Sequence, residues 1–269
     1  MSVVQRNNVR TFGSGDHVLV FAHGFGCDQS MWKFVAPAFE ESHRVVLFDL
    51  TGAGQSDLSA YDYASYGKLE RHAEDIIEIC DALELEKPTL VGHSVSAITS
   101  GLAAVAAPDK IGSVVMVAPS PCFLNQPEYT GGFDRADLEQ VIDFMQQNYL
   151  GWAEQMAPTI AGDGAEGPAS QMLTQSFCRT DPDIARHFGE VTFLSDKRAE
   201  MSQIDVPTLI LQCANDALAP TSVGEWMEKT IPNATLNVID TFGHCPHLTA
   251  PDATIQAIDS YLSREQANR

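Results

Sequence analysis

The chain has 269 residues and a formal net charge of −20, from 36 acidic and 16 basic side chains. Such a polyanion is repelled by nucleic acids and by anionic membranes, so neither is expected as a partner. Hydrophobic residues make up 44% of the sequence, enough for the core of one large domain. No segment approaches the roughly 20 apolar residues of a membrane span. The first residues also lack the apolar stretch of a signal peptide, so a cytoplasmic location is expected.

Strand-like and helix-like segments alternate along the first half of the chain. Residues 18–21 form an apolar, β-rich run that leads into the glycine-containing loop 22–26, and residues 43–48 form a second such run. Residues 66–85 place apolar side chains on one helical stripe, and residues 113–117 predict another strand. This alternation predicts an α/β fold, a mostly parallel sheet with helices on both faces.

The most informative segment is residues 89–97, which join an apolar strand to an apolar helix through a tight turn. A serine at the tip of such a turn is typical of a nucleophile elbow with the pattern G-x-S-x-G. Gly92 and Ser94 occupy the first two defined positions, whereas Ser96 replaces the last glycine. Serine is small enough to keep the strand and the helix close together. An ordinary turn serine is the alternative interpretation.

Strand signals disappear between residues 122 and 202. Residues 134–149 predict a helix, and Asp181 is placed to cap another helix that ends near Leu194. The connection 161–168 is rich in glycine and predicts a flexible link. We therefore predict an α/β-hydrolase core made of residues 1–121 and 203–269, with a helical lid of residues 122–202 over the site.

Two further strands are predicted after this insertion, and a polar side chain follows each of them. Asp216 lies just past the run 206–213, and His244 follows the run 234–239. Residues 220–230 and 251–262 predict helices that open with a proline. Because parallel strands end at the same edge of an open sheet, Asp216 and His244 are expected to lie near Ser94.

The order Ser, Asp, His along the chain is that of nucleophilic sites on open α/β sheets. We predict Ser94 as the nucleophile, His244 as its base and Asp216 as the carboxylate that orients the base. The backbone N–H groups of Phe25 and Val95 are the predicted oxyanion hole. The alternatives are His247 for the base, which we expect to be structural, and Asp205 or Asp240 for the carboxylate.

The six cysteines give no sign of a metal site or a disulfide framework. None has C-x-x-C spacing or lies at a zinc spacing from histidines, so reduced and mostly packed thiols are expected. The loop around Gly24 and Gly26 lacks the spacing of a dinucleotide fingerprint. We predict no metal and no cofactor, since a serine nucleophile with its base needs neither.

Segments over the whole chain carry a resemblance to a known family. They are residues 6–9, 13–15, 24–30, 35–41, 44–49, 92–95, 119–122, 131–133, 209–214 and 243–247. They resemble the RsbQ-like α/β hydrolases, which include a bacterial stress-response regulator and the plant karrikin and strigolactone receptors. The resemblance implies a four-helix lid over a small apolar pocket, and slow hydrolysis of small esters or lactones. It also implies signalling, in which the bacterial regulator acts with a PAS-domain phosphatase.

Apolar side chains, most of them in the insertion, are candidates to line the implied pocket. They are Phe133, Trp152, Met156, Phe193 and Leu218, together with Phe25. Periodicity alone favours lid core for each of them, and the resemblance favours the pocket. We predict a serine hydrolase, a carboxylesterase or lactonase that cleaves small apolar esters through an acyl-enzyme. The alternative is a ligand-dependent regulator that acts with a PAS-domain phosphatase.

Overall fold

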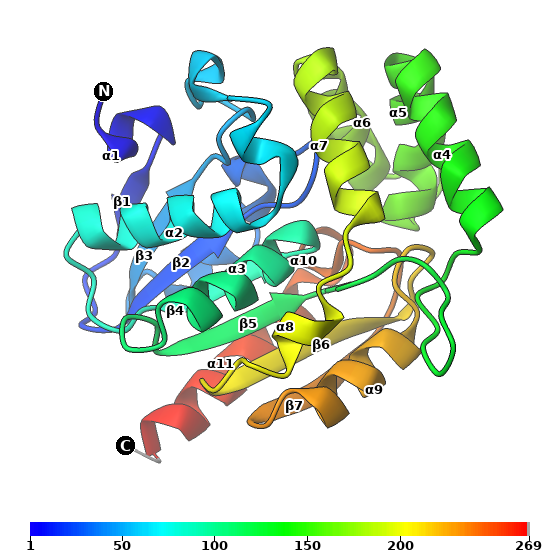
Figure 1. Ribbon diagram of the computed structural model, residues 1–269. Coiled ribbons are helices and arrows are strands. Elements are labelled where there is room, and N and C mark those ends of the chain that lie inside the picture. The colour runs from blue at the N-terminus through cyan, green and yellow to red at the C-terminus, as the bar shows by residue number, and fades with distance from the viewer. Residues whose placement is uncertain (268–269) are drawn as a thin grey trace.

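The computed structural model describes residues 1–267. Seven strands form one sheet in the order β1-β3-β2-β4-β5-β6-β7, parallel throughout except for the β1–β3 pair (Figure 1). The strands are β1 (Arg10–Phe12), β2 (Val18–Ala22), β3 (Arg44–Phe48), β4 (Thr89–His93), β5 (Ser113–Val117), β6 (Thr208–Asn215) and β7 (Ala234–Phe242). The predicted α/β fold is confirmed.

Helices cover both faces of the sheet because its strands are apolar on both sides. In β2, Val18 and Val20 face a cluster shared with α2, α3 and α9, whereas Leu19 and Phe21 face a cluster shared with α11. The α-helices outside the insertion are α1 (Val3–Arg6), α2 (Glu70–Ala82), α3 (Val95–Ala106), α9 (Thr221–Thr230), α10 (Pro246–Thr249) and α11 (Pro251–Ala267), and the short α8 (Arg198–Met201) lies at the end of the insertion. This double-sided burial fixes the strand ends that carry the site.

Four of the five helices between β5 and β6 group together beside one end of the sheet (Figure 1). They are α4 (Arg135–Gln147), α5 (Tyr149–Ala161), α6 (Pro168–Arg179) and α7 (Pro182–Leu194). They share an apolar cluster of their own that also takes in the loop after β2. Isolated bridges join Cys122 to Asp196 and Leu124 to Phe133, so the insertion is not entirely helical. Within residues 1–267 no helix is long and apolar enough to cross a membrane.

Local backbone conformation explains where helices differ from their predicted bounds. The helix predicted over 66–85 begins only at Glu70, because Lys68 is extended with φ −148° and ψ 149°. The helix predicted over 134–149 ends at Gln147, since Asn148 leaves the helical region and caps α5 with its side chain. Asp181 caps α7, as predicted, by accepting hydrogen bonds from the N–H groups of Asp183 and Ile184.

Candidate active site

The turn between β4 and α3 holds Ser94 in a strained conformation, with φ 55° and ψ −121°. Its N–H donates to the Val117 carbonyl at 2.8 Å, which ties the turn to β5. A Cβ atom on Gly92 would lie 2.2 Å from the Ser96 carbonyl oxygen. The turn therefore closes only with glycine at position 92, and it lifts the Ser94 side chain from the end of the sheet as an elbow does.

Three side chains from separate strand ends form one hydrogen-bonded chain. Ser94 Oγ lies 2.8 Å from His244 Nε2, and His244 Nδ1 lies 2.7 Å from Asp216 Oδ2. A carboxylate only accepts hydrogen bonds, so Nδ1 carries the proton and Nε2 is free to accept the Ser94 hydroxyl. Asp216 Oδ1 accepts from the N–H groups of Leu218 and Ala219 at 2.8 and 3.1 Å. The arrangement suits proton removal from Ser94.

The backbone of His244 is also held on both sides. Its N–H donates to the Ile160 carbonyl at the end of α5, at 2.6 Å, and its carbonyl accepts from His93 Nε2 at 2.9 Å. Gly162 and Gly243 make this contact close, with φ values of 77° and 84°. A Cβ atom on Gly243 would lie 2.0 Å from the Ala161 carbonyl oxygen. The lid is thus joined to the loop that carries His244.

The three alternative residues lie elsewhere. His247 is buried, with its ring 4.7 Å from that of Trp32 and 4.3 Å from that of His93, and burial lowers its pKa to about 3. Asp205 precedes β6 and so lies at the opposite end of that strand from Asp216. Asp240 is exposed within β7. None of them takes part in the hydrogen-bonded chain among residues 1–267.

Two backbone N–H groups lie beside the elbow. Val95 is the first residue of α3, and Phe25 follows β2 in the loop of residues 23–26, called here the oxyanion loop. Neither N–H group has an acceptor among the backbone hydrogen bonds of the described turns, loops and helix caps. A Cβ atom on Gly24 would lie 2.5 Å from His93 Nδ1 and 3.5 Å from Ser94 Cβ. The oxyanion loop therefore rests directly against the elbow.

A small apolar cavity of about 30 Å³ opens onto Ser94 and His244. Its walls come from the core loops and from α5, α6 and α7 of the lid. The other lining residues are Phe25, Cys27, His93, Phe123, Trp152, Ile160, Leu173, Phe177, Thr192, Phe193, Leu218 and Cys245. The Phe25 ring lies 5.9 Å from the Trp152 ring and 6.2 Å from the Phe177 ring, which keeps the cavity narrow.

Of the predicted pocket residues, Trp152, Phe193 and Leu218 line this cavity. Phe133 and Met156 lie outside the lining and pack at the edge of the lid cluster. Sequence reasoning did not single out Leu173 and Phe177, which line the cavity from α6. Their spacing of four residues on one helix face is the signal that could have found them.

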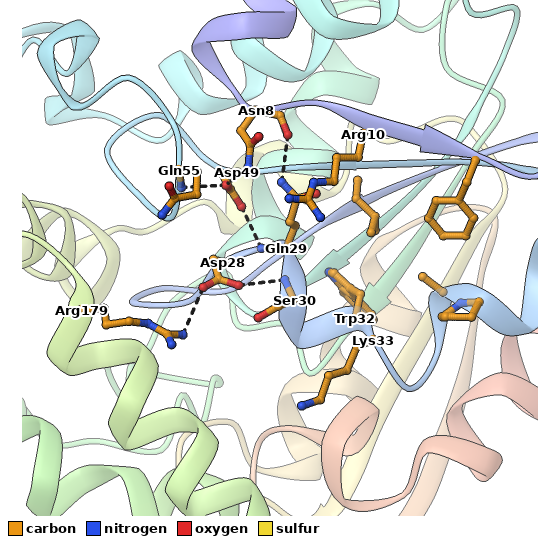
Figure 2. Close-up of a pocket in the computed structure, with 14 residues that line it drawn as sticks. Asn8, Arg10, Asp28, Gln29, Ser30, Trp32, Lys33, Asp49, Gln55 and Arg179 are labelled. Atoms are coloured by element: carbon orange, nitrogen blue, oxygen red, sulfur yellow. Dashed lines mark hydrogen bonds and ion pairs between the residues drawn. The ribbon is translucent and has the colours of Figure 1, made fainter.

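A larger open groove of about 570 Å³ lies on the core surface and does not include Ser94. It runs beside Asp49, whose carboxylate accepts from the N–H groups of Gln29 and Gln55 and from the Asn8 amide (Figure 2). Asp28 pairs with Arg179 of α6 across the groove at 3.4 Å. These bonds hold the loops around Asp49 in place, which is a structural role.

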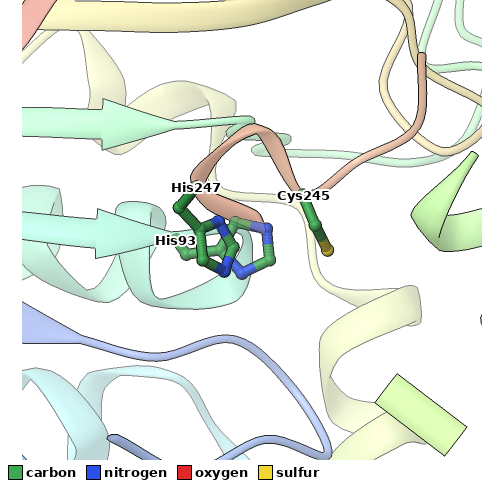
Figure 3. A group of neighbouring side chains, drawn as sticks. All are labelled: His93, Cys245 and His247. Carbon is green, nitrogen blue, oxygen red and sulfur yellow. The ribbon is translucent and has the colours of Figure 1, made fainter. Parts of the chain in front are cut away.

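One group among residues 1–267 has the composition of a metal site: His93, Cys245 and His247, with ligand atoms within 4.8 Å of one another (Figure 3). His93 Nε2 is already engaged by the His244 carbonyl. Burial raises the pKa of the Cys245 thiol well above its ordinary value, so the thiol keeps the proton that a metal would have to displace. These conditions favour a packed, neutral group.

Comparisons with known proteins agree on one family. Residues 17–251 match the model of the alpha/beta hydrolase fold. The chain is 38% identical to a strigolactone esterase of Pisum sativum over 96% of this chain and 97% of that protein. It is 35% identical to the karrikin insensitive 2 receptor CA of Petunia hybrida over 98% of both. A solved hydrolase of Oleispira antarctica is 42% identical, with a TM-score of 0.94 over 97% of this chain and 96% of that one.

Proposed function

Because the chain belongs to the α/β-hydrolase family and has esterases among its relatives, we propose that it is a serine hydrolase of small apolar esters or lactones. The observation that carries the proposal is the continuous hydrogen-bonded chain from Asp216 through His244 to Ser94. All three groups are buried beside a cavity, where a hydroxyl can be activated and water kept out.

The reaction proceeds in two halves. Ser94 Oγ attacks the ester carbonyl carbon while His244 Nε2 takes its proton, and the N–H groups of Phe25 and Val95 hold the resulting oxyanion. The intermediate collapses, the C–O bond to the leaving alcohol breaks, and His244 returns the proton to that alcohol. Water then attacks the acyl-enzyme by the same route and releases the acid. Asp216 stabilises the imidazolium and fixes its orientation.

The cavity supports a short acyl chain. A space of about 30 Å³ is filled by a few heavy atoms, and its apolar walls leave a charged acyl group without partners. Trp152, Phe193 and Leu218 are the proposed contacts of the acyl chain. We expect acetyl and butyryl esters of a good leaving group to have the highest kcat/KM, because longer chains require the lid cluster to repack.

The test compares kcat/KM for p-nitrophenyl esters from acetyl to decanoyl. The wild-type protein should favour the shortest two or three, and Ser94→Ala should lose about 10⁴–10⁶ in kcat while keeping its melting temperature. More than a few per cent of wild-type activity in Ser94→Ala would remove Ser94 from the mechanism. A preference for octanoyl or longer esters would contradict the proposed acyl site.

A ligand-dependent regulator is the second candidate, favoured by similarity over nearly the whole chain to proteins named as receptors. In this reading the same site processes a small apolar molecule in the cytoplasm, and the output is contact with a PAS-domain phosphatase. Generic ester turnover would then fall below the enzyme median of about 10 s⁻¹. Complementing a deletion strain with wild type or Ser94→Ala tests it. Absence of any signalling phenotype, together with turnover well above that median, contradicts the regulator.

A further inference from the structure

Ser96 occupies the position at which the elbow pattern has its last glycine, and its side chain has a definite partner. The residue lies in the first turn of α3 and is 1% exposed. Its hydroxyl donates to the carbonyl oxygen of His23 at 2.5 Å. His23 opens the oxyanion loop, so this bond joins the helix that carries the Val95 N–H to the loop that carries the Phe25 N–H. Glycine at position 96 would leave the His23 carbonyl without this donor.

The His23 ring continues the connection. The Leu50 N–H donates to His23 Nε2 at 3.0 Å, so Nδ1 carries the proton and donates to the Gly24 carbonyl at 2.9 Å. Burial lowers the pKa of His23, which keeps the ring neutral and this tautomer in place. The Gly24 carbonyl also accepts from the Cys27 N–H at 3.3 Å. Two successive carbonyl groups of the loop are therefore held by hydrogen bonds.

The direction of these carbonyl groups sets the direction of the Phe25 N–H. A trans peptide points its C=O and its N–H to opposite sides. Donors on the Gly24 carbonyl therefore turn the Phe25 N–H away from them, and the Ser96 bond fixes the preceding peptide plane. An oxyanion donor acts through orientation set before the reaction, so a small rotation of this peptide weakens it.

We propose that Ser96 is a positioning residue that holds the oxyanion loop against the nucleophile helix and so aims the Phe25 N–H at the reacting oxygen. The inference rests on the proposed function of Ser94, although Ser96 itself touches no substrate. Restoring the consensus glycine should then lower activity rather than raise it.

The experiment compares Ser96→Ala and Ser96→Gly with Ser100→Ala as the matched control. Ser100 lies one turn further along α3, is equally buried, and its hydroxyl has no hydrogen-bond partner among the described residues. Three quantities are measured on folded protein: kcat and KM for p-nitrophenyl acetate, and the inhibition constant of a short alkyl trifluoromethyl ketone, which forms a tetrahedral adduct. Both Ser96 variants should lose about tenfold to a hundredfold in kcat, with KM within twofold of wild type.

The inhibition constant separates positioning from mere stability. It should rise by the same factor by which kcat/KM falls, because inhibitor and transition state use the same N–H groups. Lower melting temperatures with unchanged kcat and inhibition would overturn the proposal. So would failure of both Ser96 variants to fold while Ser100→Ala folds, since the hydroxyl would then act in folding. If the wild type hydrolyses no ester, the proposed function fails; if it does and the Ser96 variants match it, only this inference fails.

Discussion

The core and the lid contribute to the site in different ways. Ser94, Asp216 and His244 all come from loops at the ends of sheet strands. Several aromatic walls of the cavity, Trp152 and Phe177 among them, come from lid helices. The proposed reacting groups thus belong to the sheet, whereas much of the cavity shape belongs to the insertion.

The two regions are also held by different forces. Backbone geometry fixes the core positions: Ser94 is strained at φ 55°, and its N–H is bonded to β5. Ring packing fixes the lid positions, such as the 5.6 Å contact between Trp152 and Phe177. Side-chain packing can be altered without moving a strand end. We infer that the core determines the reaction and that the lid determines which acyl chain is accepted.

The largest effect should come from removing the proposed general base, which belongs to the core. His244→Ala should lose about 10⁴–10⁶ in kcat, as much as loss of Ser94, because the two act as a unit. His247→Ala should mainly lose stability, about 2–4 kcal/mol, since its ring packs against Trp32 and His93. Steady-state kinetics and urea unfolding of both variants provide the measurements. A kinetic loss confined to His247→Ala would exchange the two roles.

A second test of the core changes only the turn that carries Ser94. Gly92→Ala places a Cβ atom 2.2 Å from the Ser96 carbonyl oxygen, so the turn has to open. We expect a loss of roughly 3 kcal/mol in unfolding free energy and a fall in kcat of more than a hundredfold. Gly67→Ala is the control, because its added Cβ meets nothing within 4 Å. Equal stability and activity in the two variants would show that the elbow tolerates a side chain.

A pair of phenylalanines on α7 tests how the lid selects the acyl chain. Phe193 lines the cavity, whereas Phe188 contacts the Phe25 ring at 5.8 Å from outside the lining. Phe193→Ala should raise the ratio of kcat/KM for hexanoyl over acetyl ester about tenfold, while Phe188→Ala leaves this ratio unchanged. Both should lose about 3–5 kcal/mol of stability. The same shift in both variants would mean that lid loosening, rather than cavity volume, selects the chain length.

The smallest effect is on stability and concerns the contact between the core and the lid. His72 of α2 is buried 4.6 Å from the Phe188 ring of α7, and burial lowers its pKa to about 3. The unfolded chain protonates this group near pH 6.5 and the folded chain does not, so stability falls as pH drops from 6.5 towards 3. Between pH 7 and 5 the contribution is about 2 kcal/mol. His72→Leu should reduce the change in unfolding free energy between pH 7 and 5, measured by urea titration, by that amount. An unchanged pH dependence would contradict the assignment.

Local patterns predict the core well because each strand end carries its own signal. Asp216 and His244 follow apolar runs, and parallel pairing brings such ends together. The catalytic roles of these residues stay predictions. Edge strand β1 has no clear pattern, since two of its three residues are exposed and its pairing with β3 is a tertiary contact.

The lid lining and the contacts that support the proposed reacting residues are harder to predict. Whether Met156 or Phe177 faces the cavity depends on how four amphipathic helices rotate against one another, which no single helix determines. The bond from Ser96 to His23 joins residues 73 positions apart. The small size of serine explains why it fits beside the elbow. It does not predict which carbonyl group the hydroxyl contacts.

The junction between α5 and the His244 loop also bears on protein engineering. The Ile160 carbonyl accepts the His244 N–H, and Gly162 and Gly243 meet with almost no space between their backbones. A lid exchanged as a cassette has to keep this last turn of α5, or the graft displaces the base along with the pocket. Residues 135–157 carry no such tie to His244 among the described backbone hydrogen bonds, so the acyl specificity of this scaffold is best redesigned there.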